Sequence, residues 1–378
     1  MSQQNRHLVP PAQPVAAQNL RAHDVLVALD IGLSTTKIAC QIGRHGEPMV
    51  HRLPSRALPI SPSQLHALGG GIRPFESTIR VDQHPWVAAI DLSPAGGRLR
   101  LDDKLVVGTH GWLAHARAAL ARLGQSRISE LIVGLPLKDF LTPSRRELAA
   151  ERLVGAHPLP YGARIEVERV TVMPQSFGAL RLWELQFTAY RGRIWDRDAP
   201  VLVVDCGHRT VSWMLTLGRS ILQHCSGASA CAGARLQRCV RAMLKVQLHR
   251  RVSAARMEWR CRQADRWMDL GKAKIHLDTY LRGACLRIVP GVIHELKTAL
   301  EPLNDSLDSV VLTGGLAEFF APAMRAAFPY ASLVCSAEPA TANARGLLQS
   351  DRKLVAGELA PDGLGMPGSN GVSAPQKR

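Results

Sequence analysis

The sequence contains no apolar run of 18 residues, and aromatic residues make up only 5% of it. A helix needs about 20 mostly apolar residues to cross a membrane, so we expect neither a membrane span nor a membrane partner. Residues 1–22 are polar and rich in Pro and Gln, and they lack the apolar stretch of a secretory signal peptide. These absences predict a cytoplasmic protein, and its 46% hydrophobic residues predict a core filled mainly by aliphatic side chains.

The eight cysteines form no Cys-x-x-Cys pair, and no His pair at zinc-finger spacing accompanies them. Zinc fingers need such spacings, and disulfide frameworks are typical of small secreted domains. We therefore expect reduced and mostly buried thiols, with a metal site or a set of disulfides as the alternative.

Two common nucleotide-binding motifs are also missing. Gly-x₄-Gly-Lys-Ser/Thr does not occur, and Gly-x-Gly-x-x-Gly follows neither of the two strands described below. The first absence excludes a P-loop, and the second excludes the dinucleotide-binding Rossmann turn. A phosphate site in this chain must therefore use another kind of turn.

The net charge of +16 is unevenly distributed. Between Arg235 and Lys274, twelve Lys and Arg residues stand against three Asp and Glu, which places +9 of the charge within 40 residues. A solvated helical face explains part of this excess. A polyanionic partner, either DNA or an acidic protein surface, explains it as well, and salt-sensitive binding would be its signature.

The composition changes along the chain predict its organisation. Residues 1–22 and 351–378 resemble disordered tails, and the Pro- and Gly-rich segment from Leu53 to about Arg80 resembles a long surface loop. Between the tails, apolar strands alternate with helical patterns, which predicts an α/β protein. The expected helices are Gly111–Leu123, Ser144–Val154, Gln175–Trp183, Ala234–Leu248 and Val292–Leu300.

An apolar strand that ends in Asp-x-Gly occurs twice, with 175 residues between Asp30 and Asp205. Small or polar residues and a second apolar run follow each copy, which predicts a strand, a tight turn and another strand. Continuous apolar strands are typical of central strands that are buried on both faces. We therefore expect a duplicated fold with a cleft, built from domains at 23–190 and 191–350, the second with a basic helical subdomain at about 234–290.

The first turn has the groups that a triphosphate site needs. Gly32 permits a tight turn whose amide N–H groups can face phosphate oxygens. Ser34 and Thr35 add hydroxyl donors, and Lys37 adds a positive charge. Asp30 can hold Mg²⁺ through water, because Mg²⁺ keeps several waters and takes one or two carboxylates.

The second turn, from Asp205 to Thr210, would close on the phosphates from the other side. Asp205 is then either a second carboxylate near Mg²⁺ or the group that orients the attacking water, and Thr210 can donate to a phosphate. One Asp-x-Gly after a strand is usually plain turn chemistry. Two copies, each followed by Thr, and a later Gly-Gly turn favour a nucleotide site.

These motifs, Asp-x-Gly-x-Ser-Thr-x-Lys, Asp-x-Gly-x-x-Thr and Thr-Gly-Gly in this order, resemble those of the actin/Hsp70/sugar-kinase superfamily over roughly Val25–Leu348. Within it, the chain looks closest to the plasmid-segregation actins of the ParM/StbA type, for example the StbA-like proteins of PRTRC gene cassettes. Further stretches that carry this resemblance are Leu105–Gly108 before a helix, Val133–Pro136, Met173–Ala179 and Ala342–Gly346.

The resemblance implies a fold of duplicated actin-like (ribonuclease H-like) domains with ATP and Mg²⁺ in the cleft between them. Asp30 and Asp205 would flank Mg²⁺, and Gln175 would position the hydrolytic water. The residues implied to line the nucleotide are Asp30, Gly32, Ser34, Thr35, Lys37, Gly207, Thr210, Gly233, Gly314 and Gly315.

The implied function is an ATPase whose nucleotide-dependent filaments segregate or position plasmid or mobile-element DNA. The partners would be further copies of the chain, and DNA or a DNA-bound adaptor protein at residues 235–274. Bulky Leu33, His208 and Arg209, and Ser212 in place of an acidic residue, depart from the family pattern. They favour the alternative of a non-polymerising switch with weak or no hydrolysis, while a small-molecule kinase would need a carboxylate where Gln175 stands.

Overall fold

The computed structural model describes residues 24–43, 46–60, 78–82, 84–89, 105–159, 163–191, 196, 198–218, 220–271, 273–303, 306–336 and 338–350. The predicted tails at 1–22 and 351–378 lie outside the described residues, as does most of the predicted loop at 53–80. Among the described residues, no helix has both the length and the apolar character that a membrane crossing requires. All eight cysteines are free; those that are buried are Cys40, Cys206, Cys225 and Cys285.

The first sheet orders its strands β11-β8-β1-β2-β3. β1 pairs antiparallel with β2, which pairs antiparallel with β3, while β8 lies parallel to β1 and β11 parallel to β8. The strands are β1 Val25–Ile31, β2 Thr35–Ile42, β3 Met49–Pro54, β8 Glu130–Leu135 and β11 Val170–Pro174. The helices that accompany them are α2 His110–Ala121, α3 Leu137–Phe140, α4 Pro143–Leu153 and α5 Gln175–Arg191.

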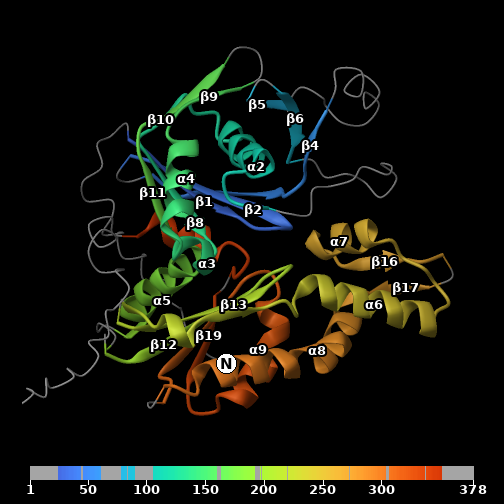
Figure 1. Ribbon diagram of the computed structural model, residues 1–378. Coiled ribbons are helices and arrows are strands. Elements are labelled where there is room, and N and C mark those ends of the chain that lie inside the picture. The colour runs from blue at the N-terminus through green and yellow to red at the C-terminus, as the bar shows by residue number, and fades with distance from the viewer. Residues whose placement is uncertain are drawn as a thin grey trace, which may run out of the picture.

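The second sheet repeats this topology, with the order β19-β18-β12-β13-β14 and the same parallel and antiparallel pairings. Figure 1 shows the two sheets one above the other. The strands are β12 Pro200–Cys206, β13 Val211–Leu217, β14 Ser220–Ile221, β18 Ser309–Thr313 and β19 Ser332–Cys335, with β15 Gly227–Ser229 added beside β13. The helices are α6 Gly233–Gln247, α7 Ala254–Arg262, α8 Leu277–Leu300, α9 Ala317–Ala327 and α10 Ala342–Leu348, with the short 3-10 helix η3 at Gln223–Cys225.

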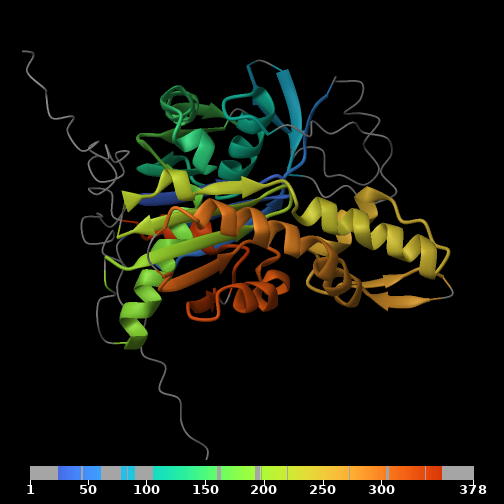
Figure 2. The same ribbon diagram turned by 60° about the horizontal axis from the view of Figure 1, so that its bottom comes forward.

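Smaller sheets lie at the margins of both halves. The first half has two three-stranded sheets, with the strand orders β4-β6-β5 and β7-β10-β9. In the second half, β16 and β17 form a hairpin beside α6 and α7. Both ribbon views show α6, α7, β16 and β17 projecting together from the second sheet (Figures 1 and 2). The strands are β4 Ala57–Pro59, β5 Thr78–Val81, β6 His84–Ala88, β7 Arg127–Ile128, β9 Gly155–Pro158, β10 Arg164–Val167, β16 Trp267–Asp269 and β17 Lys274–His276.

Three sequence expectations need correction. The predicted loop from Leu53 contains strand β4 and the first residues of β5, because prolines are compatible with the edges of a small sheet. The resemblance implied a strand–helix unit at Leu105–Gly108, but this segment contains no strand and ends in a turn before α2. The helix expected from Val292 begins at Leu277 and continues through Pro290. Its first part was not predicted, because proline and glycine usually indicate the end of a helix.

The central strands β1 and β12 are buried along their whole length, as their apolar sequences predict. Alternate side chains point to opposite faces of a strand. Val27 and Leu29 of β1 therefore pack in the core of the first half, whereas Leu26 and Ala28 pack in a core that both sheets share. In β12, Leu202 packs in the core of the second half, and Val203 packs in the shared core.

The shared core contains α5 and α10, whose backbones touch where they cross. A Cβ atom at Gly346 would lie 1.7 Å from the carbonyl oxygen of Gly178, and one at Gly178 would lie 2.0 Å from the carbonyl oxygen of Asn343. These distances are far below van der Waals contact, so both positions require glycine. The crossing places α10, the last helix among the described residues, against α5, the helix that follows the first sheet.

An ion pair joins the two halves on the side of the projecting unit. Arg56, between β3 and β4, donates to Glu258 of α7 over 2.6 Å, and its side chain is only 6% exposed. Arg262 of α7 also contacts Glu258, at 2.9 Å. Since a buried guanidinium needs a carboxylate partner, this contact holds α7 against the first half.

Replacing Gly346 tests the helix crossing. We expect Gly346→Ala to lower the free energy of unfolding by about 1–3 kcal/mol, because α5 and α10 must move apart to admit the methyl group. Urea denaturation measures this change. Gly291→Ala is the matched control, since a Cβ at Gly291 of α8 meets no atom within 4 Å; it should be neutral or stabilise by up to about 1 kcal/mol. Equal stability of the two variants would contradict the crossing.

Replacing Glu258 tests the ion pair between the halves. Glu258→Ala leaves Arg56 buried without a carboxylate, so we expect a loss of about 3 kcal/mol in the free energy of unfolding. Glu318→Ala is the control, because Glu318 is 53% exposed and its partner Arg266 keeps Asp278; it should cost less than about 0.5 kcal/mol. If both variants unfold at the same urea concentration, the contact does not stabilise the pairing of the halves.

Candidate functional site

The two Asp-x-Gly turns have the same local geometry. Asp30 pairs with Lys37 across the β1–β2 hairpin, and Asp205 pairs with Ser212 across the β12–β13 hairpin. A Cβ at Gly32 would lie 2.9 Å from the carbonyl oxygen three residues later, and one at Gly207 would lie 2.8 Å from the equivalent oxygen. Each turn is thus too tight for a side chain at this position.

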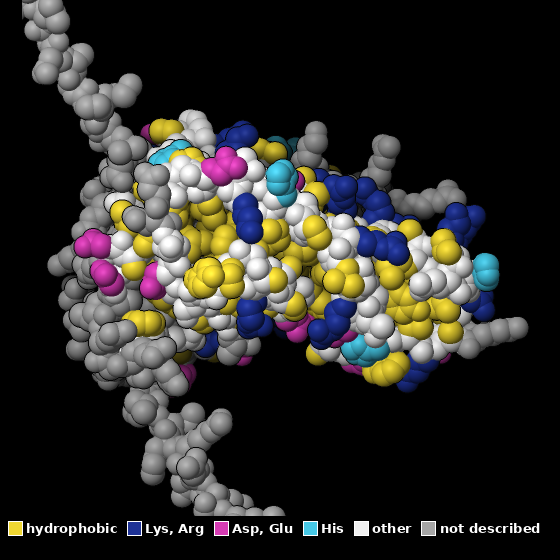
Figure 3. Space-filling model, turned by 90° about the horizontal axis from the view of Figure 1, so that it is seen from below, with side chains coloured by type: hydrophobic (Ala, Val, Ile, Leu, Met, Phe, Trp, Pro, Cys, Tyr) yellow, Lys and Arg dark blue, Asp and Glu magenta, His cyan; other side chains and the backbone are white. Residues whose placement is uncertain are grey.

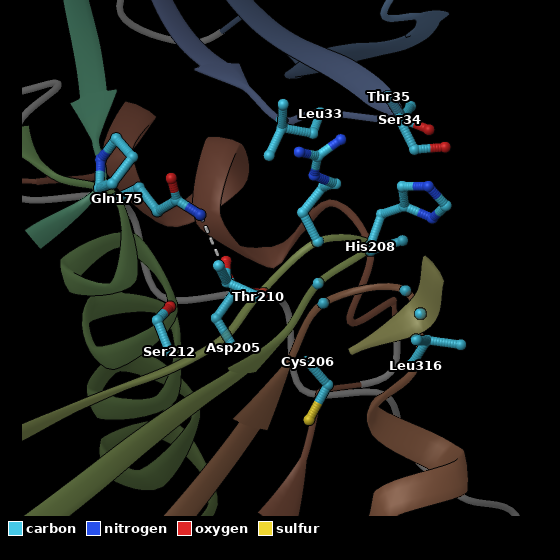
Figure 4. A pocket seen from close by; sticks show the side chains of 18 of the residues that line it. Leu33, Ser34, Thr35, Gln175, Asp205, Cys206, His208, Thr210, Ser212 and Leu316 are labelled. Carbon is cyan, nitrogen blue, oxygen red and sulfur yellow. Dashed lines mark hydrogen bonds between the residues drawn. The ribbon is translucent and has the colours of Figure 1, made fainter. Parts of the chain in front are cut away.

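Both turns open into one cavity of about 1120 Å³ between the two sheets. Figure 4 shows Leu33 and Ser34 of the first turn facing His208 of the second across this space. Asp30 does not line the cavity but lies buried behind it. The predicted site residues that line the cavity are Gly32, Ser34, Thr35, Lys37, Gln175, Asp205, Gly207, Thr210, Gly233, Gly314 and Gly315.

Asp30 is paired with Lys37, whose Nζ lies 3.1 Å from Asp30 Oδ2. Burial raises the pKa of Asp30, the positive charge of Lys37 opposes this, and the negative charge of Asp205 adds to the rise. Hydrogen bonds from Lys37 and Asn343 lower the pKa of Asp30 again. The carboxylates of Asp30 and Asp205 therefore lie close enough to repel each other, and the ammonium of Lys37 partly offsets this repulsion.

Asp205 accepts two side-chain amide hydrogens on the same oxygen. Gln175 Nε2 and Asn343 Nδ2 each lie 2.8 Å from Asp205 Oδ2, and Figure 4 marks the first of these bonds. Gln175 stands at the start of α5 and Asn343 near the start of α10. The Gln175 amide oxygen is therefore left to accept a hydrogen from another group, such as a water molecule.

Asn343 is a residue of the candidate site that sequence reasoning missed. It belongs to the stretch Ala342–Gly346, which supported the family resemblance without any role for this side chain. The signal was a polar residue between two alanines at the start of the helix, and such a residue is usually a cap or a surface position. Here the side chain is buried, at 4% exposure, and it contacts a carboxylate 138 residues away.

Glycines at the far side of the second turn complete the cavity wall. Gly314 has φ +87°, and a Cβ there would lie 2.4 Å from Asp205 Oδ1, so the backbone and the carboxylate both require glycine. Gly233 begins α6, and its N–H donates to the Gly207 carbonyl while that of Ala234 donates to the His208 carbonyl. The first N–H groups of α6 therefore fasten the second turn and do not bind an anion themselves.

Glu258 reaches the first turn from α7. The hydroxyl of Ser34 donates to Glu258 Oε1 over 3.3 Å, so a carboxylate already occupies one predicted phosphate donor. Burial lowers the pKa of the neighbouring His208; Glu258 opposes this, while Arg209, Arg262 and Arg56 add to it. The lowered pKa favours the neutral imidazole of His208, which adds bulk to the second turn.

The residues around Asp30 and Asp205 fit a magnesium nucleotide. Mg²⁺ takes oxygen ligands from one or two carboxylates and keeps several waters. Asp30 Oδ1 and Asn343 Oδ1 are buried oxygens without a hydrogen-bond partner in the described part of the protein. Within that same part, no three His, Cys, Asp or Glu side chains form a cluster that would suit a metal held by protein ligands alone.

The comparisons with known proteins agree with this architecture. Residues 28–178 match the family model "Actin like proteins N terminal domain". No curated protein sequence matches the chain. At the level of structure, an archaeal actin homolog, Ta0583, superposes with a TM-score of 0.66 and 17% identity over 86% of this chain and 98% of its own.

Two ParM structures are similar over the same share of each chain, 86% of this one and 98% of their own. A non-polymerisable quadruple mutant of pCBH ParM has a TM-score of 0.64, and a 15-stranded ParM filament from Clostridium botulinum has 0.61; each is 14% identical. Ta0583 also matches in its complex with ADP, at 18% identity and a TM-score of 0.64. Residues 28–178 thus match the N-terminal domain of actin-like proteins, and the chain as a whole has the fold of the actin-like ATPases.

Proposed function

We propose that the chain binds ATP–Mg²⁺ in the cavity between the two sheets and hydrolyses it. The observation that carries this proposal is the pairing of Gln175 with Asp205 at the cavity wall, between two turns that only glycine permits. The complex of Ta0583 with ADP supports a nucleotide as the ligand. When bound, Mg²⁺ would neutralise phosphate charge and orient the phosphates for attack.

The contacts of Gln175 and Asp205 suggest a different role in hydrolysis for each residue. The Gln175 amide donates its hydrogen to Asp205, which leaves its oxygen to accept a hydrogen from the attacking water. An amide orients water but is a poor proton acceptor, so Gln175 would position the nucleophile. Asp205 would hold that amide in place and face the cation, while Ser34, Thr35 and Thr210 would donate to the phosphates.

We further propose that ATP binding drives assembly into filaments of the ParM/StbA type, which segregate or position plasmid or mobile-element DNA. The support is the likeness to a ParM filament and to an Alp12 filament, the latter with a TM-score of 0.54 and 12% identity over 88% of this chain and 98% of its own. Head-to-tail contacts between copies of one chain generate open filaments when the rotation does not close.

The projecting unit is the proposed contact for DNA or for a DNA-bound adaptor protein. From below, Lys and Arg side chains recur over this unit and few acidic ones accompany them (Figure 3). Among the described residues, many of its cations form no ion pair, so their charge is free to attract a polyanion. These residues are Arg235, Arg238, Arg241, Lys245, Arg250, Arg251, Arg256 and Arg260.

A non-polymerising nucleotide switch is the second candidate, and one contact favours it. Glu258 contacts both Ser34 and Arg56, and its negative charge would repel a phosphate at the Ser34 hydroxyl. Such a contact slows nucleotide exchange and turnover if it must break first. The chain would then report nucleotide state through the position of α7 without assembling.

Asp205→Asn tests the assigned site. The substitution keeps the shape of the side chain but removes the charge, so we expect ATP hydrolysis to fall by about 100-fold or more while the circular dichroism spectrum is unchanged. Phosphate-release kinetics measure the rate, and calorimetric titration with ATP and Mg²⁺ measures binding. Asp308→Asn, an exposed position that hydrogen-bonds Ser309, is the control and should keep the wild-type rate. Full activity of Asp205→Asn would show that the chemistry lies elsewhere.

Sedimentation distinguishes the two candidate functions. We expect the protein to pellet with ATP or a non-hydrolysable analogue and to stay in the supernatant with ADP or without nucleotide. Light scattering under the same conditions follows assembly over time. Binding of nucleotide without any nucleotide-dependent pellet would reject the filament and leave the switch.

A further inference from the structure

The buried polar atoms beneath the cavity differ in whether they have a hydrogen-bond partner. The donors described there are engaged: Lys37 Nζ binds Asp30, and Gln175 Nε2 and Asn343 Nδ2 both bind Asp205. Four buried side-chain atoms have no partner among the described residues: Arg56 Nε and Trp213 Nε1 are donors, whereas Asp30 Oδ1 and Asn343 Oδ1, the two that belong to residues in contact with these carboxylates, are acceptors. These two oxygens therefore suit a group that donates hydrogen bonds or carries positive charge.

A water molecule bound to a cation is such a group. Its oxygen lone pair is committed to the metal, so both of its hydrogens point outwards and require acceptors. Mg²⁺ dehydrates reluctantly and keeps several such waters when it binds a nucleotide. Two buried acceptors behind a carboxylate that lines the cavity match this requirement, whereas they would repel a phosphate oxygen.

The position of Asn343 is built into the fold. Its backbone carbonyl lies where α10 touches Gly178 of α5, so the helix crossing fixes the backbone from which this side chain projects. Its side chain is close enough to Asp30 to lower the pKa of that carboxyl, and it hydrogen-bonds Asp205 directly. Asn343 thus lies between the carboxylates that end the central strands of the two sheets.

We propose that Asn343 is a ligand of the magnesium water shell, and that its amide oxygen and Asp30 Oδ1 hold the waters of the cation from beneath the cavity floor. An amide adds an acceptor without adding a third negative charge beside the triphosphate. Removal of the nucleotide and cation leaves these two acceptors unsatisfied, so occupancy of the cavity is coupled to the α5–α10 crossing. This inference rests on the proposed function of the cavity as a site for ATP–Mg²⁺.

Calorimetric titration with ADP, in Mg²⁺ and in EDTA, measures the ratio of the two affinities and needs no turnover. For the wild type we expect tighter binding with Mg²⁺. For Asn343→Ala we expect that ratio to shrink by about 10-fold or more, which is the usual effect of removing an outer partner of a metal site. Mn²⁺ binding in the presence of ADP, followed by electron paramagnetic resonance, should weaken by the same factor.

Ser350→Ala is the matched control. Ser350 is also buried, just beyond α10, and its hydroxyl donates to the Gly346 carbonyl, so its loss loosens the same region without touching the carboxylates. This variant should keep the wild-type ratio. If Asn343→Ala keeps the ratio as well, Asn343 has a structural role only and the proposal is wrong.

If Asn343→Ala does not fold, Asn343→Asp tests the proposed role of Asn343 instead. The new carboxylate keeps the acceptor but lies against Asp205, so we expect a lower melting temperature without metal and a larger rise on addition of Mg²⁺ and ADP than in the wild type. An equal rise in both proteins would overturn the proposal. Failure of the wild type to bind ADP under any condition would instead reject the proposed function itself.

Discussion

The Asp205 carboxylate joins three segments that are separate in the sequence. One of its oxygens accepts amide hydrogens from Gln175, which begins the helix after the first sheet, and from Asn343, which lies in the last helix. The side chain is only 5% exposed, and a carboxylate buried to this degree is costly without such donors. The relative position of the two sheets at the cavity therefore depends on these two hydrogen bonds.

Close backbone contacts make this arrangement precise to within a fraction of an ångström. The crossing of α5 and α10 at Gly178 and Gly346 leaves no room for a methyl group, and Gly314 is packed against Asp205 in the same way. Protein interiors transmit such constraints because they are packed as densely as crystals. A change at the carboxylates is thus expected to reach the helices of the shared core, and through Glu258 and Arg56 it also reaches the projecting unit.

The repeated strand and turn were predictable because their signals are local. A continuous apolar run that ends in Asp-x-Gly indicates a buried central strand and a tight turn, and the structure confirms both hairpins and the duplicated topology. The strand β4 was not predicted, because Pro and Gly between Leu53 and Arg80 indicate a loop to any local rule. The part of the long helix α8 before Val292 was not predicted for the same reason, since its Pro290 and glycines are tolerated through packing against the second core.

The sequence by itself determined the α/β class, the two tight Asp-x-Gly turns and eleven of the residues that line the cavity, because each follows from the order of neighbouring residues. Only the tertiary structure decided which side chains meet across the cavity. The contact of Asn343 with Asp205 spans 138 residues and that of Arg56 with Glu258 spans 202. Such pairs leave no trace in local periodicity, because they form only after both sheets have packed on the shared core.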